Sequence, residues 1–381
     1  MGLNNSQWFG KTAGFYNGVA TQSLRFDDGS AHKLTKDFTG SSPTDNKKMT
    51  ISVWVKRGNL NTGSTQVILA NYNNVRFLGE LCWDDDSDTI RFDPGGDGNG
   101  STNAYRVRTT ALFRDVGSWY HVVCAYDSTQ ATDTNRIKIY VNGDQKDLVV
   151  DTTNPLQPQT FPPLNYGHLY SYAGPNNTIG EFGGGFNSGY LDGYLSEFNF
   201  IDGQALDPTY FGETKNGVWI AKKYEGSYGN NGYRLEFVGT GTSTSSGAVS
   251  SPTNIGDDSS GNNNHWAVSG LRSTDANLPD SPENNFPTIN ILHQGSAYSS
   301  VTNSEGNLSL KHSNLAHASA IATMGLPKSG KWYWETLINS SSTSGTNAVG
   351  VVDSTYNNSN ALSGAGNPFW SNGFGIYGNT G

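Results

Sequence analysis

Alternating hydrophobic and polar residues form the strongest pattern in the first half of the chain, and they predict β-strands. The segment Met49–Arg57, MTISVWVKR, is the clearest case. Its apolar face would carry Met49, Ile51, Val53 and Val55. Residues 119–126, WYHVVCAY, are apolar on both faces, as expected of a central strand that is covered on both sides. A hairpin is predicted at Asn142-Gly143, because both residues accept positive φ.

Other strands follow at short, regular intervals. They are predicted at Ser23–Phe26, Gln66–Ala70, Val75–Trp83, Thr89–Phe92, Ala104–Val107, Arg136–Val141 and Tyr233–Val238. No convincing amphipathic helix separates them. Many short strands joined by turn residues are typical of a β-sandwich.

The stretch Tyr190–Glu213 combines a strand with its exit. In the strand, Leu191–Ile201, the pattern places Tyr194, Phe198 and Phe200 on one face and Glu197 and Asn199 on the other. Asp202-Gly203 then predicts a turn, and Pro208 favours a short turn of helix over residues 206–209.

Composition supports a strand-rich globular protein. Only 34% of the 381 residues are hydrophobic, but 12% are aromatic and 47 are glycine. Disordered chains are poor in aromatic residues, so we expect a folded chain with many turns. The net charge of −9 argues against nucleic-acid binding, which needs clustered Lys and Arg. Cys82 and Cys124 are expected to be free, buried thiols.

The N-terminal segment 1–22 predicts an arm rather than a leader. MGLNNSQWFG has neither a basic region nor an apolar core, so no signal peptide is expected. No apolar run reaches the roughly 20 residues that span a membrane. Met1-Gly2 with Ser6 matches the myristoylation pattern, but a pattern this short often arises by chance. An arm that docks on a partner and a frayed terminus both remain open.

A resemblance emerges from the order of the motifs. SLRF, MTISVWVKR, SWYHVVCAYD, IKIYVNG and GYLDGYLSEFNFIDGQALDPTYFGE occur in succession over residues 23–213. This order resembles the laminin-G-like, concanavalin-like jelly roll. The variants VKRG and DGQALDPTYFGE resemble virion structural proteins of tailed bacteriophages. The resemblance implies an all-β jelly-roll sandwich in a phage particle.

The rest of the chain divides at a change in composition. Residues 214–328 are expected to be an irregular connector with few strands, linker-like around GTGTSTSSGAVSSPT. Residues 329–381 resemble the start of a SPRY-type sandwich. KWYWETLI would place Trp332, Trp334 and Ile338 on one strand face, with further strands at Ala348–Val352 and Gly373–Tyr377. This second sandwich would be incomplete; we favour a fragment of a longer protein over completion by a second chain.

One loop has the residues for a calcium site. Asp84, Asp86 and Asp88 alternate in WDDDSD, so an extended backbone would place their carboxylates on one side, and Asp93 follows closely. Oxygen clusters on loops hold Ca²⁺, and laminin-G-like domains often carry Ca²⁺ at the rim. The alternative is an acidic, solvated hairpin tip.

The sequence gives little support for catalysis. Concanavalin-like glycosidases place two carboxylates on one strand, and no such run occurs. Glu197 stands alone, and in the resembled family that position is generally structural. His121 beside Trp119 is interpreted as a packed strand residue.

A glycan site is the more serious candidate for a jelly roll. Sugar sites combine an aromatic platform with polar acceptors on loops. The candidate residues are Tyr166, Tyr170, Tyr172, Asn176 and Asn177. The same tyrosines could instead pack a long loop onto the sandwich or against another subunit.

The resulting expectation is a non-enzymatic virion protein: a tail or head fibre, spike or adhesin that acts in particle assembly and host-surface contact. Expected partners are other virion proteins, copies of the chain (a trimer, as in phage fibres generally) and a host cell-surface glycan. No cofactor other than Ca²⁺ is expected. The alternatives are a virion-associated polysaccharide depolymerase on the same fold and a cytosolic interaction protein that uses the SPRY-like unit.

Overall fold

A computed structural model of the chain forms two compact units, residues 1–286 and 287–381. The structure describes residues 15–60, 63–73, 76–84, 87–95, 105–153, 158–170, 176–182, 188–247, 249, 251–292, 301–312, 320–339, 346–352 and 373–379. Among these residues no helix is long and apolar enough to cross a membrane.

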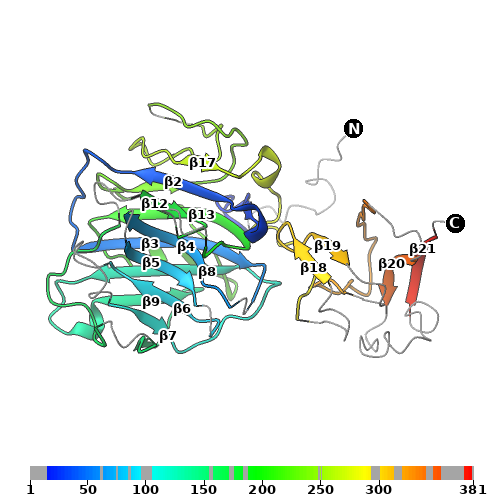
Figure 1. The fold of residues 1–381 in the computed structure, drawn as a ribbon, viewed down its shortest axis with the longest axis horizontal. Coiled ribbons are helices and arrows are strands. Elements are labelled where there is room, and N and C mark those ends of the chain that lie inside the picture. The colour runs from blue at the N-terminus through cyan, green and yellow to red at the C-terminus, as the bar shows by residue number, and fades with distance from the viewer. Residues whose placement is uncertain are drawn as a thin grey trace. The chain divides into compact units, whose positions relative to one another are not determined.

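Unit 1 is a sandwich of two antiparallel sheets (Figure 1). The seven-stranded sheet has the order β1-β13-β3-β8-β9-β10, with β16 paired to β13. Its strands are β1 (Leu24–Phe26), β13 (Gly193–Asp202), β3 (Lys48–Arg57), β8 (Tyr120–Asp127), β9 (Ile137–Val141), β10 (Asp144–Gln145) and β16 (Tyr233–Leu235).

The eight-stranded sheet has the order β11-β7-β6-β5-β4-β12-β2-β17. Its strands are β11 (Leu148–Val150), β7 (Val107–Thr109), β6 (Ile90–Asp93), β5 (Arg76–Trp83), β4 (Gln66–Asn73), β12 (Asn176–Ile179), β2 (Lys33–Asp37) and β17 (Ala267–Ser269). Strands far apart in sequence are neighbours here, as in a jelly roll. The all-β sandwich is therefore confirmed.

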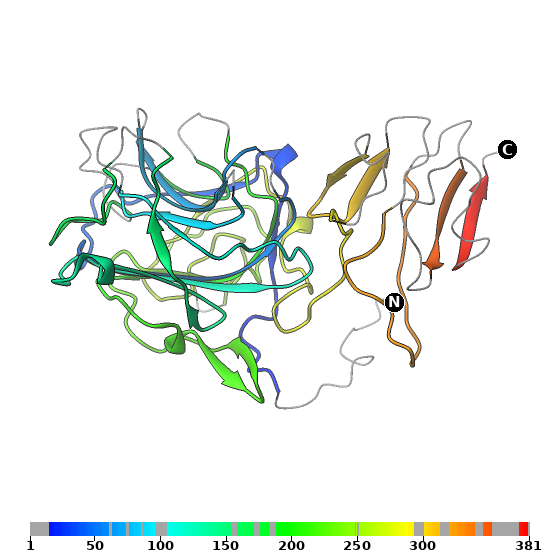
Figure 2. The ribbon, with the colours of Figure 1, turned by 90° about the horizontal axis from the view of Figure 1, so that it is seen from below.

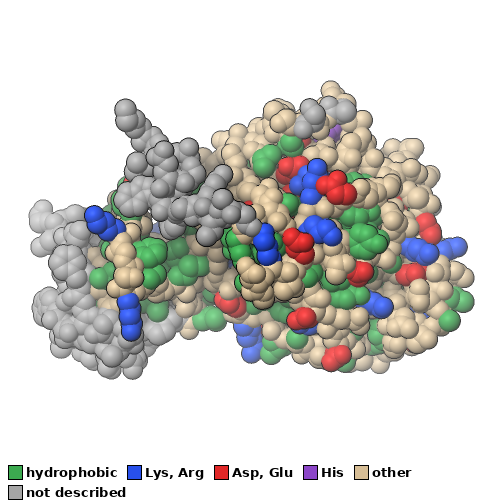
Figure 3. Space-filling model, turned by 180° about the vertical axis from the view of Figure 1, so that it is seen from behind, with side chains coloured by type: hydrophobic (Ala, Val, Ile, Leu, Met, Phe, Trp, Pro, Cys, Tyr) green, Lys and Arg blue, Asp and Glu red, His purple; other side chains and the backbone are tan. Residues whose placement is uncertain are grey.

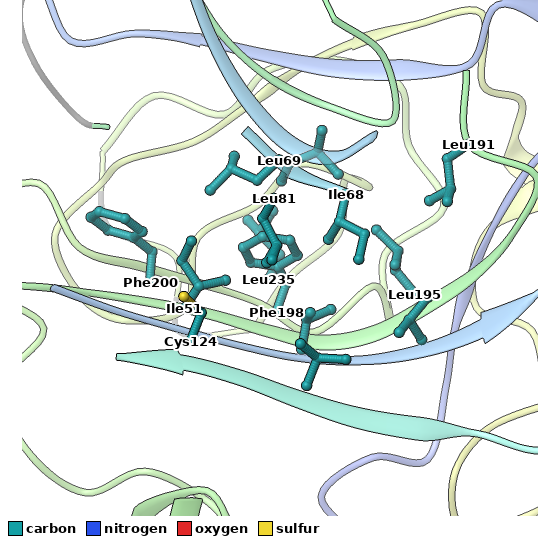
Figure 4. Packing of buried hydrophobic residues seen from close by; sticks show 14 of the residues in the cluster. Ile51, Ile68, Leu69, Leu81, Cys124, Leu191, Leu195, Phe198, Phe200 and Leu235 are labelled. Carbon is teal, nitrogen blue, oxygen red and sulfur yellow. The ribbon is translucent and has the colours of Figure 1, made fainter. Parts of the chain in front are cut away.

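The main core lies between the two sheets. Figure 4 shows Ile51, Cys124 and Phe198 of the seven-stranded sheet meeting Ile68, Leu69 and Leu81 of the eight-stranded sheet. The predicted apolar face of β3 is confirmed, because Met49, Ile51, Val53 and Val55 all belong to this core. Both cysteines are free and buried, as predicted.

The outer face of the seven-stranded sheet is also covered. A second cluster around Trp54, Trp119 and Tyr194 packs under the hairpin of β14 (Gly212–Lys215) and β15 (Val218–Ala221), which is drawn in light green in Figure 2. A third cluster places Val123 of β8 against residues of the 201–228 segment. The central strand β8 is thus buried on both faces, as its sequence predicts.

One predicted face is wrong. Tyr194 does not share a face with Phe198 and Phe200, because it packs with Trp54 while the two phenylalanines enter the main core. The register of β13 against β3 shifts between Ser196 and Asn199, and Glu197 has φ 47°. A β-bulge here inserts a residue and reverses the phase of the side chains beyond it.

Two turn predictions are confirmed. Asn142 and Gly143, with φ 53° and 87°, join β9 to β10 in a two-residue hairpin. The 3-10 helix η4 (Pro208–Tyr210) begins with Pro208, and the Asp207 side chain accepts a hydrogen bond from Thr209 N at 2.8 Å.

Unit 1 extends well past residue 213, where we placed the end of the jelly roll. Strand β16 pairs with β13, and β17 pairs with β2 and forms the edge of the eight-stranded sheet. The described residues of the predicted arm also bind within unit 1: Val19 N donates to Glu283 Oε1 at 2.8 Å, and Asn17 Nδ2 donates to Glu213 Oε1 at 2.9 Å. Residues 1–14 lie outside the described part.

The described residues of unit 2 form two small sheets. Strands β18 (Val301–Ser304) and β19 (Ser309–His312) form one, and β20 (Thr346–Val352) and β21 (Gly373–Asn379) form the other. The predicted strands at 348–352 and 373–377 are therefore confirmed. The strand predicted for KWYWETLI is wrong: residues 331–339 have no regular secondary structure, and Trp332, Trp334 and Ile338 are exposed.

Candidate functional site: a charged ladder on the eight-stranded sheet

Charged side chains line the face of the eight-stranded sheet that points away from the main core. Leu81, Phe92 and Val107 enter that core, so their neighbours in sequence lie on the opposite face. We call this set the charged ladder. It consists of Glu80, Asp84, Arg91, Asp93, Arg106 and Arg108.

Strand register brings the ladder together. Glu80 of β5 lies opposite Asp93 of β6, and Arg91 of β6 lies opposite Arg108 of β7. Arg91 Nε is 2.8 Å from Glu80 Oε1, and Arg91 Nη1 also binds the Asp84 carboxylate. Arg106 Nε lies 3.3 Å from Glu80 Oε1 and 3.5 Å from Asp93 Oδ2. Like charges thus lie directly opposite each other across the strands, and the ion pairs run diagonally between neighbouring strands.

Burial and the charges of the ladder together shift the pKa values of its two facing acids, Glu80 and Asp93, in opposite directions. Burial alone would raise the pKa of Glu80, but Arg91 and Arg106 together lower it. Burial raises the pKa of Asp93 to about 6; Arg106 opposes this shift and the Glu80 charge adds to it. Glu80 is therefore ionised at neutral pH, while Asp93 exchanges its proton close to that range.

The facing pair of Glu80 and Asp93 has the features of an acid–base pair, which the sequence pattern did not indicate. Two carboxyl groups with separated pKa values are the arrangement used for a general acid and a base. A catalytic pair was expected along one strand, whereas Glu80 and Asp93 face each other across two strands. The hairpin pairing of residues 76–83 with 90–93 could have indicated it. Both side chains are almost fully buried, at 2% and 3% exposure.

The predicted calcium residues are not brought together. Asp84 and Asp93 belong to the ladder, each with an arginine partner. Asp88 has φ 52°, which breaks the expected alternation, and it pairs instead with Arg57 at 3.0 Å and Arg114 at 2.9 Å. Asp86 lies outside the described residues. Within the described part of the chain, no three His, Cys, Asp or Glu side chains form a group that could hold a metal.

The predicted glycan residues do not form one exposed platform. Tyr170 must be corrected: it is 1% exposed, its hydroxyl donates to Asp93 O at 2.9 Å and its ring stacks on Phe92. Asn177 is buried as well, and its Oδ1 accepts from Asn71 Nδ2 at 3.0 Å. Tyr166 is half-buried, with its ring edge-to-face with that of Tyr105. Tyr172 and the Asn176 side chain lie outside the described part.

Two residues that we interpreted as structural have full sets of contacts. Glu197 accepts two hydrogen bonds from Arg234, at 3.0 and 2.6 Å, and thereby fixes the bulge of β13 to β16. His121 is 1% exposed; its Nδ1 accepts from Trp219 Nε1, and its Nε2 lies 2.9 Å from Ser52 Oγ. On the face drawn in Figure 3, acidic and basic side chains are interspersed rather than gathered by sign.

Comparison with known proteins identifies the fold. Residues 27–209 match the family model described as the concanavalin A-like lectin/glucanases superfamily. Among curated proteins, no sequence matches the chain.

Solved structures with similar folds include a pentraxin of Limulus polyphemus and domains LG4-5 of the mouse laminin α1 chain. A third is a protein of Bacteroides ovatus that is provisionally described as carbohydrate-binding. In this order, sequence identities are 16%, 13% and 17%, with TM-scores of 0.33, 0.31 and 0.33. The matches cover 49%, 61% and 55% of this chain, and 78%, 52% and 54% of the other chains. Similarity at this level says nothing about a ligand.

The family match and the predicted motif order fall on the same segment, which supplies most strands of both sheets. Residues 27–209 thus carry the concanavalin A-like lectin fold.

Proposed function

We propose that the chain is a non-enzymatic structural and adhesive protein of a tailed-bacteriophage particle, and that its jelly roll binds a glycan through the charged ladder. The phage setting rests on the motif order over residues 23–213, with the VKRG and DGQALDPTYFGE variants. The glycan assignment rests on one observation, which is the array of three guanidinium groups and three carboxylates on one face of a lectin fold.

The ladder has suitable chemistry for sugar hydroxyls. Planar guanidinium and carboxylate groups give strong, directional hydrogen bonds, and they hold each other in fixed orientations. Arg108 is the most open member, with 28% of its side chain exposed, and Arg106 follows with 19%. These two arginines would therefore make the first contacts, while the buried acids orient them.

Calorimetry with purified host polysaccharide tests the glycan assignment. Arg108→Gln should weaken binding by about tenfold, the loss expected for one charged hydrogen bond. Arg114→Gln is the matched control, because Arg114 pairs with Asp88 away from the ladder and is 56% exposed. If both variants bind as the wild type does, the glycan binds outside the ladder. If none of the three proteins binds, the glycan assignment is wrong.

A second candidate function follows from Glu80 and Asp93. A facing base and acid on this fold favour glycoside hydrolysis as the alternative. Incubation with host polysaccharide should release no reducing ends if the chain only binds. Release by the wild type that Glu80→Gln and Asp93→Asn both abolish, while each variant still unfolds cooperatively, would establish the depolymerase instead.

The particle assignment needs a separate measurement. Labelled antibody against the chain should decorate purified particles at a fixed position, and cross-linking should give a trimer, as in phage fibres generally. Particles that lack the chain, with the protein found only in the infected-cell extract, would contradict the virion role and favour a cytosolic interaction protein.

A further inference from the structure

A lysine is buried in an aromatic layer on the outer face of the seven-stranded sheet. Lys56 lies on β3 opposite Tyr194 of β13, and its side chain is 0% exposed. Its Nζ lies 5.8 Å from the centroid of the Tyr194 ring, which packs in one cluster with Trp54 and Trp119. Such surroundings disfavour a charged ammonium group. Burial accordingly lowers the pKa of Lys56, although the charge of Asp280 opposes this shift.

Three oxygen atoms from one distant segment surround the Lys56 amine. Its Nζ donates to Asp280 Oδ2 at 3.0 Å and to Asn285 Oδ1 at 2.9 Å. It also donates to Phe286 O at 2.6 Å. Asn285 lies 229 positions from Lys56 in the sequence. An amine, a carboxamide and a carboxylate therefore meet at one point, and they are the nucleophile, the acyl group and the proton carrier that amide formation between side chains requires.

The Asn285 carboxamide is held in position for attack. Its Nδ2 donates to Gly117 O at 2.7 Å, so both ends of the amide are fixed. Its Cγ is one C=O bond, about 1.2 Å, from Oδ1. A shift of the amine by at most about 1 Å therefore brings Nζ to the roughly 3–3.5 Å from Cγ at which reacting atoms are productive. Asn285 itself is exposed, so a group that leaves from its Cγ can escape into solvent.

We propose that Lys56 and Asn285 join through an intramolecular amide bond, with Asp280 as the catalytic base and acid. The Asp280 carboxylate takes a proton from the Lys56 ammonium group, and the neutral amine attacks Asn285 Cγ to give a tetrahedral intermediate. Asp280 passes this proton and a second one from Nζ to Nδ2. The Cγ–Nδ2 bond then breaks, and the nitrogen leaves as ammonium. One C–N bond forms, one breaks, and Asp280 ends as it began.

Asp280 keeps hydrogen bonds after the positive charge of Lys56 is gone. Its Oδ1 accepts from Trp119 Nε1 and from Phe286 N, each at 3.2 Å. The N–H of the new amide replaces the ammonium group beside Oδ2, so the carboxylate stays satisfied. The bond would fix the segment around residue 285 to β3 and close unit 1 covalently. It does not depend on the proposed glycan binding.

Mass spectrometry of the denatured full chain tests the bond. Wild-type protein that has folded should be lighter than its sequence mass by one ammonia, about 17 Da. Digestion with trypsin should give one branched peptide that joins residue 56 to residue 285. Asn285→Ala should keep its full sequence mass. Its Tm should fall by about 10 °C, because the bond closes a long ring in the unfolded chain, whereas the loss of one hydrogen bond costs only a few degrees.

Asn284→Ala is the matched control, since Asn284 is the neighbouring exposed amide and is not among the three acceptors of Lys56. It should lose one ammonia as the wild type does. Asp280→Asn should fold without forming the bond, because no group then carries the protons. If Asp280→Asn does not fold, the comparison of Asn285→Ala with Asn284→Ala still decides, because both changes are at exposed positions.

The proposal is overturned if folded wild-type protein keeps its full sequence mass after prolonged incubation. It is also overturned if Asn285→Ala loses ammonia as the wild type does. Loss of one water, with a branched peptide that joins residues 56 and 280, would contradict the assignment to Asn285, because Asp280 would then be the group that is attacked.

Discussion

At the scale of single residues, two buried histidines stand out because burial keeps them neutral. Burial lowers the pKa of His121 to about 3 and that of His168 to about 4. His168 lies among aromatic rings, edge-to-face with Tyr126 and Phe200. An unfolded histidine has a pKa near 6.5. At these two positions the folded chain therefore binds fewer protons than the unfolded chain at mildly acidic pH.

This difference predicts acid sensitivity. Where the unfolded state binds more protons, stability falls as the pH falls, so each histidine costs stability as the pH drops below about 6.5, down to its folded pKa. Between pH 6.5 and 5, His168 should contribute about 1.6 kcal/mol of this loss. Urea unfolding at pH 6.5 and at pH 5 gives the free energy of unfolding at each pH. In His168→Phe the difference between the two values should be smaller than in the wild type by that amount. The wild type and His168→Phe would show parallel losses if the histidine were already charged.

Tyr126→Phe is the control for that measurement. It removes the hydrogen bond from the Tyr126 hydroxyl to Tyr166 O beside the same histidine. The phenol does not titrate in this pH range, because burial raises its pKa further. The variant should therefore lose stability equally at pH 6.5 and 5 and keep the wild-type slope.

At the scale of elements, strands were predictable and their irregularities were not. The alternation over Met49–Arg57 specifies one buried face because that strand pairs regularly with β8. The same rule failed on β13, where the bulge at Glu197 reverses the face of everything beyond it. The bulged residue Glu197 binds Arg234, which lies 37 residues away in the sequence, so the local sequence pattern does not predict the bulge. Cross-strand contacts could not be predicted for the same reason. Glu80 and Asp93 lie opposite each other only because of the register between β5 and β6.

Gly193 gives a prediction at this scale. It has φ 141°, and a Cβ there would lie 2.2 Å from Lys56 O, inside the pairing of β13 with β3. Gly193→Ala should therefore destabilise unit 1 by roughly 3 kcal/mol, from backbone strain and displacement of the strand. Equilibrium unfolding in urea measures the loss.

Gly217→Ala separates strain from steric overlap. Gly217, in the β14–β15 turn, has φ 80°, but nothing lies within 4 Å of its Cβ position. Strain alone should cost about 1 kcal/mol there. Equal losses in the two variants would mean that the close approach to Lys56 has no energetic effect.

At the scale of the whole molecule, the motif order located the sandwich but not where unit 1 ends. The recognisable motifs stop at Glu213, yet Tyr233, Leu235 and Trp266 complete the main core. Lys56 of β3 is fully buried and pairs with Asp280 at 3.0 Å. Short strands and irregular segments such as residues 257–286 have no periodicity, so composition alone made them look like a connector.

This closure predicts how truncated chains behave. A chain of residues 1–286 keeps the whole core of unit 1, so its Tm should lie within about 2 °C of the main transition of the full chain. A chain of residues 1–213 leaves the Lys56 charge without Asp280 and removes several large core side chains, among them Tyr233 and Trp266, each worth about 3–5 kcal/mol. That sum exceeds the usual stability of a domain, so the shorter chain should not unfold cooperatively. Calorimetry of monomeric fractions decides the matter: a sharp transition for residues 1–213 near that of the full chain would mean that the motif-bearing segment folds without its closing residues.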